Sequence, residues 1–229
     1  MKGSELYDDP EFLAGYQALR RDKRGLNDEL EIPAMEALLP QVAGTRVVDL
    51  GCGEGALAVR LAEQGAAEVV AVDASASMLA NAPAHPRVRY VRADLADFDL
   101  PPASVDLAVS SLALHYVEDF NQLTRRIATW LVPGGRFVFS IEHPVVTAPL
   151  VERALDNYAD EGPRQRTWFV EGVVKYHQTL ASVLSTLQRH GFTLEAVDEP
   201  LPTMAQIRAY PQLAMHRRRP PLLLVSARR

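Results

Sequence analysis

The sequence predicts an α/β protein built on a doubly wound, seven-stranded sheet that is mostly parallel. Short, continuously apolar segments alternate with amphipathic segments, a pattern typical of parallel strands covered by helices on both faces. Near the end of the chain the alternation stops, because the last two apolar segments are joined by a long stretch without helical periodicity. We therefore expect one antiparallel strand near the C-terminus and a helical cap at the N-terminus.

The first half of the chain shows the clearest alternation. Two polar-rich helices are expected at 9–21 and 28–39, and the buried strand 46–50 follows them. The helix 55–64 carries leucine and valine among alanine and charged residues and ends at Gly65. The remaining elements of this half are a strand, the start of a helix and a strand, at 68–73, 75–81 and 87–95.

The second half begins with the apolar strand 105–114. A helix over 119–131 is expected to end at the Pro-Gly-Gly turn 133–135, after which the strand 136–143 begins. The segment 144–175 contains prolines and glycines without clear periodicity, so we expect it to be irregular. A helix and two strands complete the chain, at 176–190, 192–197 and 222–226.

The composition is that of one globular domain. The chain has 229 residues, of which 48% are hydrophobic and 23% charged, and its formal net charge is −5. This negative charge argues against a nucleic-acid partner, and the basic run 216–219 precedes two prolines and is expected to be a solvated loop. The single cysteine, Cys52, cannot form an internal disulfide, and no apolar run approaches the length of a membrane span. We therefore expect a cytoplasmic protein without a membrane partner.

The stretch 47–55, VVDLGCGEG, places three glycines within five positions directly after a buried strand. Such a turn points the free N–H groups of the following helix at a ligand. Two cofactor classes use this layout. Gly51, Gly53 and Ala56 satisfy the relaxed dinucleotide fingerprint, with Asp73 placed to bind a ribose hydroxyl. An NAD(P)-dependent oxidoreductase is therefore the alternative interpretation.

The second pattern joins Asp49 to the three glycines, and in this form VVDLGCGEG resembles motif I of the class I S-adenosylmethionine-dependent methyltransferases. Other stretches resemble the later motifs of that family in the same order: AVDASASML, VRADLADF, FDLPPASVDLAVSSLALHYVED and LVPGGRFVFSIEHP. An NAD enzyme is not expected to carry all of these. The chain is identified as similar to bacterial small-molecule methyltransferases of this family (type 11-like), which implies a Rossmann-like fold.

The resemblance implies S-adenosylmethionine as cofactor and S-adenosylhomocysteine as product. Asp73 would receive both ribose hydroxyls, Asp94 would accept from the adenine amine, and Asp49 would orient the glycine turn. The implied cofactor-binding residues are Asp49, Gly51, Cys52, Gly53, Asp73, Ala74, Met78, Asp94, Leu95 and Ser110. Asp73 and Asp94 are also compatible with helix caps, although Ser75 supplies the first cap more naturally. A nucleophilic role for Cys52 is not expected, because nothing adjacent would lower its pKa.

Methyl transfer from an activated sulfonium mainly requires alignment, which contributes about 7–11 kcal/mol, more than the roughly 3–5 kcal/mol of a general base. The candidate catalytic residues follow the fourth and fifth strands, and they are His115, Glu142 and His143. His115 is the first choice, although each histidine is equally compatible with a structural role. We expect Tyr16, Arg20, Tyr116 and Trp168 to bind the substrate. No metal-ligand spacing such as HExxH is found, so no metal site is expected.

The predicted organisation is a single methyltransferase domain, 1–229. Its expected parts are an N-terminal helical cap, a cofactor-binding core, a substrate-side insertion, and a C-terminal helix with two strands, at 1–42, 43–143, 144–175 and 176–229. The expected partner is a small-molecule methyl acceptor, whose identity and methylated atom stay open, as does the oligomeric state. A non-catalytic interaction protein with this fold is a further alternative, against which the intact glycine turn, Asp73 and Asp94 argue.

Overall fold

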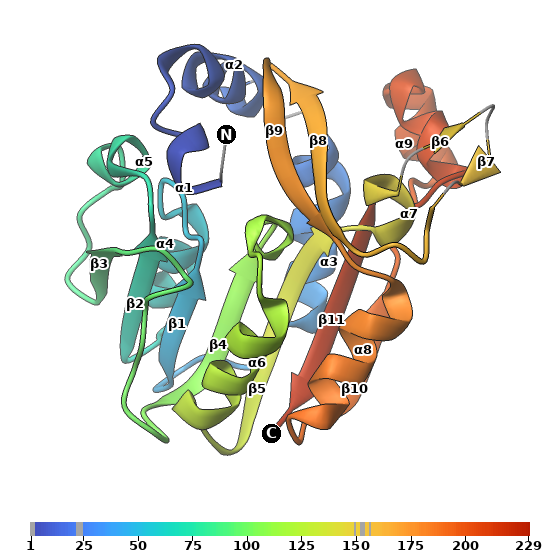
Figure 1. Cartoon of the computed structure of the whole chain (residues 1–229). Coiled ribbons are helices and arrows are strands. Elements are labelled where there is room, and N and C mark those ends of the chain that lie inside the picture. The colour runs from blue at the N-terminus through green and yellow to red at the C-terminus, as the bar shows by residue number, and fades with distance from the viewer. Residues whose placement is uncertain (1–2, 22–24, 149, 152–153, 156) are drawn as a thin grey trace.

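The structure is a computed structural model of the chain, and it describes residues 3–21, 25–148, 150–151, 154–155 and 157–229. Seven strands form one sheet in the order β10-β11-β5-β4-β1-β2-β3 (Figure 1). Pairing is parallel except at β11, which runs antiparallel to β5 and to β10. The predicted fold class is confirmed. The strands are β1 (Arg46–Leu50), β2 (Glu68–Asp73), β3 (Val88–Arg92), β4 (Val105–Ser111), β5 (Leu131–Glu142), β10 (Thr193–Asp198) and β11 (Leu222–Arg228).

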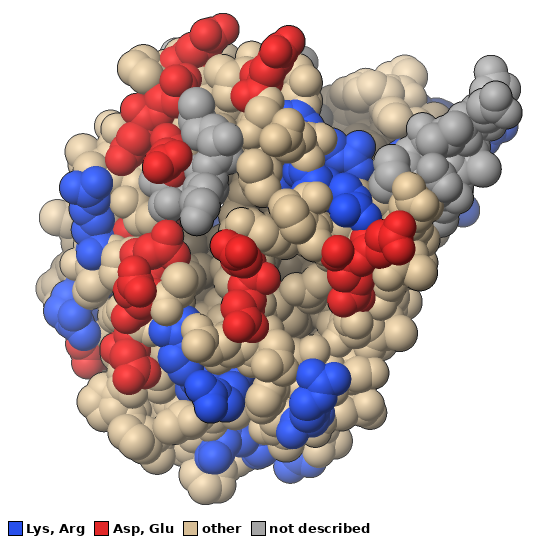
Figure 2. Space-filling view, in the orientation of Figure 1, with Lys and Arg blue, Asp and Glu red and all other residues tan. Residues whose placement is uncertain are grey.

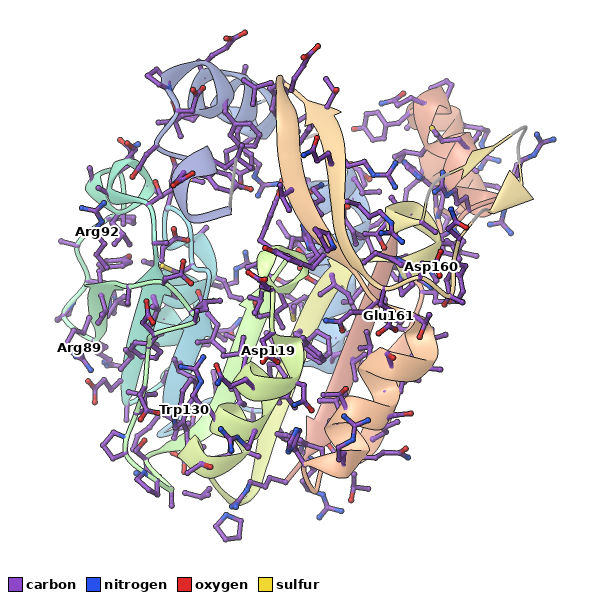
Figure 3. The ribbon with its side chains drawn as sticks, in the orientation of Figure 1. Arg89, Arg92, Asp119, Trp130, Asp160 and Glu161 are labelled. Carbon is purple, nitrogen blue, oxygen red and sulfur yellow. The ribbon has the colours of Figure 1, made fainter. Side chains whose placement is uncertain are left out.

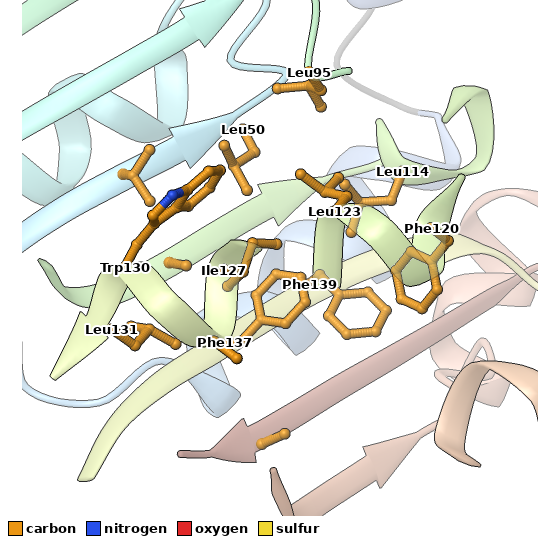
Figure 4. Close-up of a cluster of buried hydrophobic side chains, with 14 of the residues drawn as sticks. Leu50, Leu95, Leu114, Phe120, Leu123, Ile127, Trp130, Leu131, Phe137 and Phe139 are labelled. Atoms are coloured by element: carbon orange, nitrogen blue, oxygen red, sulfur yellow. The ribbon is translucent and has the colours of Figure 1, made fainter. Parts of the chain in front are cut away.

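Helices cover both faces of this sheet. On one face α6 packs Leu123 and Ile127 against Phe137 of β5 in a buried cluster (Figure 4), and α8 adds Leu187. On the opposite face α3 and α4 bury a second cluster that includes Met35. No helix in the described ranges is long and apolar enough to cross a membrane. The helices of these two layers are α3 (Ile32–Leu38), α4 (Ala56–Glu63), α6 (Phe120–Trp130) and α8 (Leu180–Arg189), and the short α5 (Ala76–Ala80) follows β2.

The N-terminal part divides between a cap and the sheet. α1 (Gly3–Leu6) and α2 (Pro10–Arg21) lie over the carboxyl edge of the parallel strands (Figure 1). The helix expected at 28–39 begins instead as a π-helical turn, η1 (Asn27–Glu31), and continues as α3. Because α3 packs on a sheet face, the predicted cap 1–42 is a cap only in its first half.

The sequence led us to expect an irregular segment at 144–175, and this expectation was wrong. It contains α7 (Pro144–Thr147), β6 (Leu150–Val151), β7 (Ala154–Leu155) and the antiparallel hairpin of β8 (Gly162–Trp168) and β9 (Val170–His177). Because β9 continues to His177, the predicted helix 176–190 starts only at Leu180, where Thr179 caps α8. The part 176–229 also holds α9 (Met204–Ala209) and the 3₁₀ helix η3 (Pro211–Arg217), which the prediction of one helix and two strands missed.

Other predicted boundaries shift for local reasons. The strand expected at 105–114 ends at Ser111, because Leu112 has a φ of 53° that no extended strand accommodates. A 3₁₀ helix, η2 (Leu114–Tyr116), follows it. The helix expected to end at 133–135 ends at Trp130, and the Pro-Gly-Gly sequence lies within β5. The strand expected at 87–95 is shortened at both ends.

The Leu123→Ala substitution tests the packing of α6. Leu123 is fully buried, so its truncation leaves a cavity and is expected to lower the free energy of unfolding by about 2–5 kcal/mol. Met204→Ala on α9 is the matched control, because Met204 is 58% exposed and its truncation should change stability by less than about 0.5 kcal/mol. Urea denaturation of both variants measures the difference, and equal stabilities would contradict the packing of α6.

Candidate functional site

The carboxyl ends of β1, β2, β4 and β5 meet at one edge of the sheet, under α1, α2 and the hairpin of β8 and β9 (Figure 1). Two adjoining hollows lie there, of about 300 and about 560 Å³, a size typical of small-molecule sites. The first hollow is lined by Ala74, Asp94, Leu95, Glu118 and Asp119. The second hollow is lined by Tyr16, Arg20, Asp49, His115, Glu142 and Trp168. Both share Tyr7, Gly51, Asp73, Ala113 and Tyr116.

The glycine turn fits tightly between two strands. Gly51 has a φ of 75°, and a Cβ atom on it would lie only 2.2 Å from the Cβ atom of Ala113. Glycine is therefore required where the end of β1 meets the loop after β4. The N–H groups of Gly51 and Cys52 both donate to the carbonyl of Val72, which holds the turn against β2.

Asp73 ends β2 with its carboxylate directed at the glycine turn. Its Oδ2 accepts from the N–H of Gly53 at 2.8 Å, and its Oδ1 accepts from the N–H of Ser75 at 2.9 Å. Ser75, not Asp73, caps α5, through a hydrogen bond from the N–H of Met78 to its Oγ. Burial raises the pKa of Asp73. Each oxygen keeps a second lone pair, so the carboxylate can still receive two hydroxyl donors.

Asp49 lies at the floor of the second hollow and is 1% exposed. Its Oδ2 makes no hydrogen bond within the described part of the chain. Burial, with the neighbouring charges of Asp73 and Glu31, raises the pKa of Asp49 to about 7. A buried carboxylate oxygen without a partner costs free energy unless a ligand supplies a donor, so this atom suits an ammonium group.

The first hollow has an acidic rim. Asp94 lines it and accepts from the N–H of Ala96 at 2.9 Å, so it caps the local turn while facing the hollow. Asp119 caps the start of α6 in the middle of the face shown in Figure 3, and Figure 2 shows acidic side chains gathered there. Arg126 donates to the carbonyls of Leu95 and Phe98, which fixes the backbone after Asp94.

Glu31 is a site residue that the sequence did not reveal. It lines the second hollow at 2% exposure, and its Oε1 accepts from the hydroxyls of Ser111 at 2.8 Å and of Ser140 at 2.6 Å. Burial raises the pKa of Glu31, and the two serine hydrogen bonds oppose that effect. Its contacts lie 80 and 109 positions away in the chain, so no local pattern marks them.

His115, Glu142 and Lys175 form a buried group beside the second hollow. The Nζ atom of Lys175 lies 2.5 Å from Oε1 of Glu142, and the N–H of Glu142 donates to Nδ1 of His115 at 3.4 Å. Burial lowers the pKa of His115 to about 4, so the imidazole is neutral near pH 7. Burial acts to raise the pKa of Glu142, but His115 and the ammonium of Lys175 together outweigh it and hold that pKa below its usual value. Lys175 is the second site residue that the sequence did not reveal.

Most of the predicted residues surround the two hollows, including Met78, Gly53 and Cys52. Burial raises the pKa of the Cys52 thiol well above its usual range, which leaves it without thiolate character. Two predicted residues point elsewhere. The hydroxyl of Ser110 donates to the carbonyl of Leu50 inside the sheet. His143 caps α7 through Nδ1 and contacts Glu199 through Nε2 at 2.6 Å, outside both hollows.

The described ranges hold no group of three His, Cys, Asp or Glu residues that could bind a metal ion.

The chain is similar in sequence and fold to known methyltransferases. The model of the methyltransferase domain family matches residues 48–139. An S-adenosylmethionine-dependent methyltransferase from Mesorhizobium loti is 48% identical, with a TM-score of 0.82 over 87% of this chain and 97% of that chain. A putative enzyme of the same kind from Listeria monocytogenes is 33% identical, with a TM-score of 0.80 over 86% of this chain and 95% of that chain. The trans-aconitate 2-methyltransferase of Variovorax paradoxus is 36% identical over 61% of this chain and 55% of its own length.

The raised pKa of Asp49 predicts how stability depends on pH. The folded pKa of about 7 exceeds the ordinary value of 3.8, so ionisation is disfavoured in the folded state. The resulting loss of folding stability is absent below pH 3.8. It grows as the pH rises from 3.8 to about 7, and it is complete above about 7. Asp49→Asn should therefore stabilise the ligand-free protein increasingly between pH 4 and 8, up to about 4 kcal/mol. Chemical denaturation at several pH values measures it; a pH-independent difference between variant and parent would contradict the assignment.

Proposed function

Because the chain belongs to the S-adenosylmethionine-dependent methyltransferases, we propose that it transfers the methyl group of that cofactor to a small-molecule acceptor by in-line displacement. The proposal rests on one observation above all. Gly51, with its left-handed backbone, and the carboxylate of Asp73 line both adjoining hollows, and Asp49, whose Oδ2 has no partner among the described residues, lines the second. We further propose that 1–229 acts as a single catalytic domain and that the protein is cytoplasmic.

The residues present fit the cofactor. Asp73 has free lone pairs for two ribose hydroxyls, and the first hollow between Ala74 and Leu95 offers apolar walls for a planar base. The buried Oδ2 of Asp49 would receive the amino group of the methionine moiety. We therefore assign the adenosine part to the first hollow, and the methionine part with the acceptor to the second.

When bound, S-adenosylmethionine supplies a methyl group that its sulfonium has already activated. The chain itself then has to orient the acceptor and exclude water. His115 acts here as a hydrogen-bond donor and not as a general base, because its Nδ1 already accepts from the backbone and its proton is therefore on Nε2. Glu142 acts as the hydrogen-bond acceptor, held ionised by Lys175. We assign no catalytic role to His143 and no cofactor contact to Ser110.

The acceptor pocket lies at the far end of the second hollow. Tyr16, Tyr116 and Trp168 supply aromatic walls there, and Arg20 is held by Asp28 at 3.5 Å. Such walls suit a small, partly apolar molecule. The name of the Variovorax relative indicates that one protein with this domain acts on a small organic acid, and a small-molecule acceptor for this chain agrees with it.

Calorimetry tests the proposed function directly. The protein should bind S-adenosylmethionine and S-adenosylhomocysteine, and NAD far more weakly. Asp73→Asn should weaken the binding by about 1.5–3 kcal/mol for each charged hydrogen bond lost. Asp97→Asn is the matched control, since Asp97 is exposed and lies outside both hollows. Tight NAD binding without S-adenosylmethionine binding would point to the oxidoreductase alternative.

A pair of substitutions at His115 separates positioning from base catalysis. Glutamine can place an N–H group where Nε2 of His115 lies, but it cannot accept a proton. His115→Ala should reduce kcat roughly 10²-fold, whereas His115→Gln should keep it within about tenfold of the parent. Turnover by mass spectrometry, with any acceptor found, gives both values. An equal loss in the two variants would restore the general-base role.

A further inference from the structure

The second hollow carries an excess of negative charge. Among the described residues, its lining holds six carboxylates and two guanidinium groups. Both guanidinium groups are already in ion pairs, Arg20 with Asp28 at 3.5 Å and Arg60 with Glu36 at 2.5 Å. Of these carboxylates, the proposed cofactor contacts use only two: Asp49 for the amino group and Asp73 for the ribose. An anionic acceptor would therefore meet like charge without an unpaired cation in this described lining.

The protein itself places a primary ammonium, that of Lys175, next to Glu142 of the second hollow. Lys175 is 6% exposed, its Nζ atom lies 4.8 Å from the ring centroid of Trp168 and 5.6 Å from that of Tyr116, and Glu142 binds it. Rings and a carboxylate together form the usual binding site of an organic cation. Within the described residues Lys175 uses Oε1 of Glu142, and Oε2 makes no hydrogen bond.

We propose that the methyl acceptor is an amine, whose nitrogen lies beside Oε2 of Glu142 and near Glu31, with the rings of Tyr16 and Trp168 as walls. This inference rests on the proposed function, because it names the substrate class of the same site. Glu142 binds the N–H groups of the acceptor and leaves its lone pair for the methyl group. Since no described residue accepts the hydrogen of His115 Nε2, this hydrogen can bind an oxygen elsewhere on the acceptor.

The transfer balances without a further reagent. The amine reacts as its free base, having released any extra proton to solvent. Its lone pair forms the new N–C bond, the C–S bond breaks, and that electron pair stays on sulfur as the neutral thioether. The nitrogen gains the positive charge that sulfur loses, so Glu31 and Glu142 stabilise the product end of the reaction. A proton then leaves the methylated nitrogen through Oε2 of Glu142 or water.

Calorimetry with two matched probes tests the acceptor class independently of turnover. The protein, loaded with S-adenosylhomocysteine, is titrated with phenethylamine and with 3-phenylpropionate, which differ chiefly in the sign of their charged group. We expect phenethylamine to bind and 3-phenylpropionate not to bind. Glu142→Gln should weaken phenethylamine roughly 10- to 100-fold, and Trp168→Leu should weaken it several-fold. Glu171→Gln is the matched control, because Glu171 is an exposed acid on the same strand as Lys175.

Each result is decisive. Retained S-adenosylhomocysteine affinity shows that Glu142→Gln has folded, and Trp168→Leu tests the site without changing any charge. Tighter binding of 3-phenylpropionate, equal binding of both probes, or binding of neither would overturn the amine proposal, while the proposed methyltransferase function would stand. Failure to bind either form of the cofactor would instead overturn that function. A mass-spectrometric screen that found esters of carboxylic acids as products, and no methylated amines, would also overturn the amine proposal.

Discussion

The close approach of Gly51 to Ala113 is the constraint on which the site depends. With 2.2 Å between the Cβ atom of Ala113 and the position of a Cβ on Gly51, the end of β1 and the loop after β4 touch backbone to side chain. Both residues line both hollows, so this contact lies where the two hollows adjoin. Ala113 is also the N-cap residue of η2, and η2 places His115 and Tyr116 in the lining of the second hollow. Because position 51 carries no side chain, the loop after β4 can approach the glycine turn, and this sets the position of His115 and Tyr116 relative to that turn.

Two carboxylates of the N-terminal part attach it to this edge of the sheet. Asp8 accepts from the Ser75 hydroxyl at 2.6 Å and from the N–H of Ser77 at 2.9 Å, and the Ser75 bond is the main cause of its lowered pKa. Glu31 joins the ends of β4 and β5 through their serine hydroxyls. The first contact closes the cap over the turn after Asp73, and the second sets the floor beside Asp49. Both contacts connect residues distant in the chain to strand ends, and through Tyr7, Tyr16 and Glu31 the N-terminal part supplies one wall of the second hollow.

Elements marked by a local pattern of apolar residues could be predicted from the sequence. Residues whose roles come from contacts with distant parts of the chain could not. β1 and β2 lie at the predicted bounds, because each is a short, mostly apolar segment, with Asp49 next to the last position of β1 and Asp73 at the last position of β2. β9 was missed because its inward-facing residues are Val173, Lys175 and His177, so two polar residues conceal the alternation of a half-buried strand. In the basic run, Arg217 and Arg219 donate to the carbonyls of Pro202 and Val145, which nothing in their own neighbourhood signals. Glu31 and Lys175 escaped prediction for the same reason, since burial and pairing define their roles.

His115 and Glu142 are both buried, but one is neutral and the other is ionised, because their neighbours differ. His115 is buried beside a backbone N–H, so it stays neutral with a pKa of about 4 and presents a hydrogen. Glu142 is buried beside an ammonium, so it stays ionised and presents lone pairs. The hairpin of β8 and β9 makes this difference, because it brings Lys175 from 33 positions away in the chain to Glu142. A hydrogen-bond donor in η2 and a hydrogen-bond acceptor at the end of β5 thus each have a fixed protonation state, an arrangement that would orient the nucleophile of the proposed reaction.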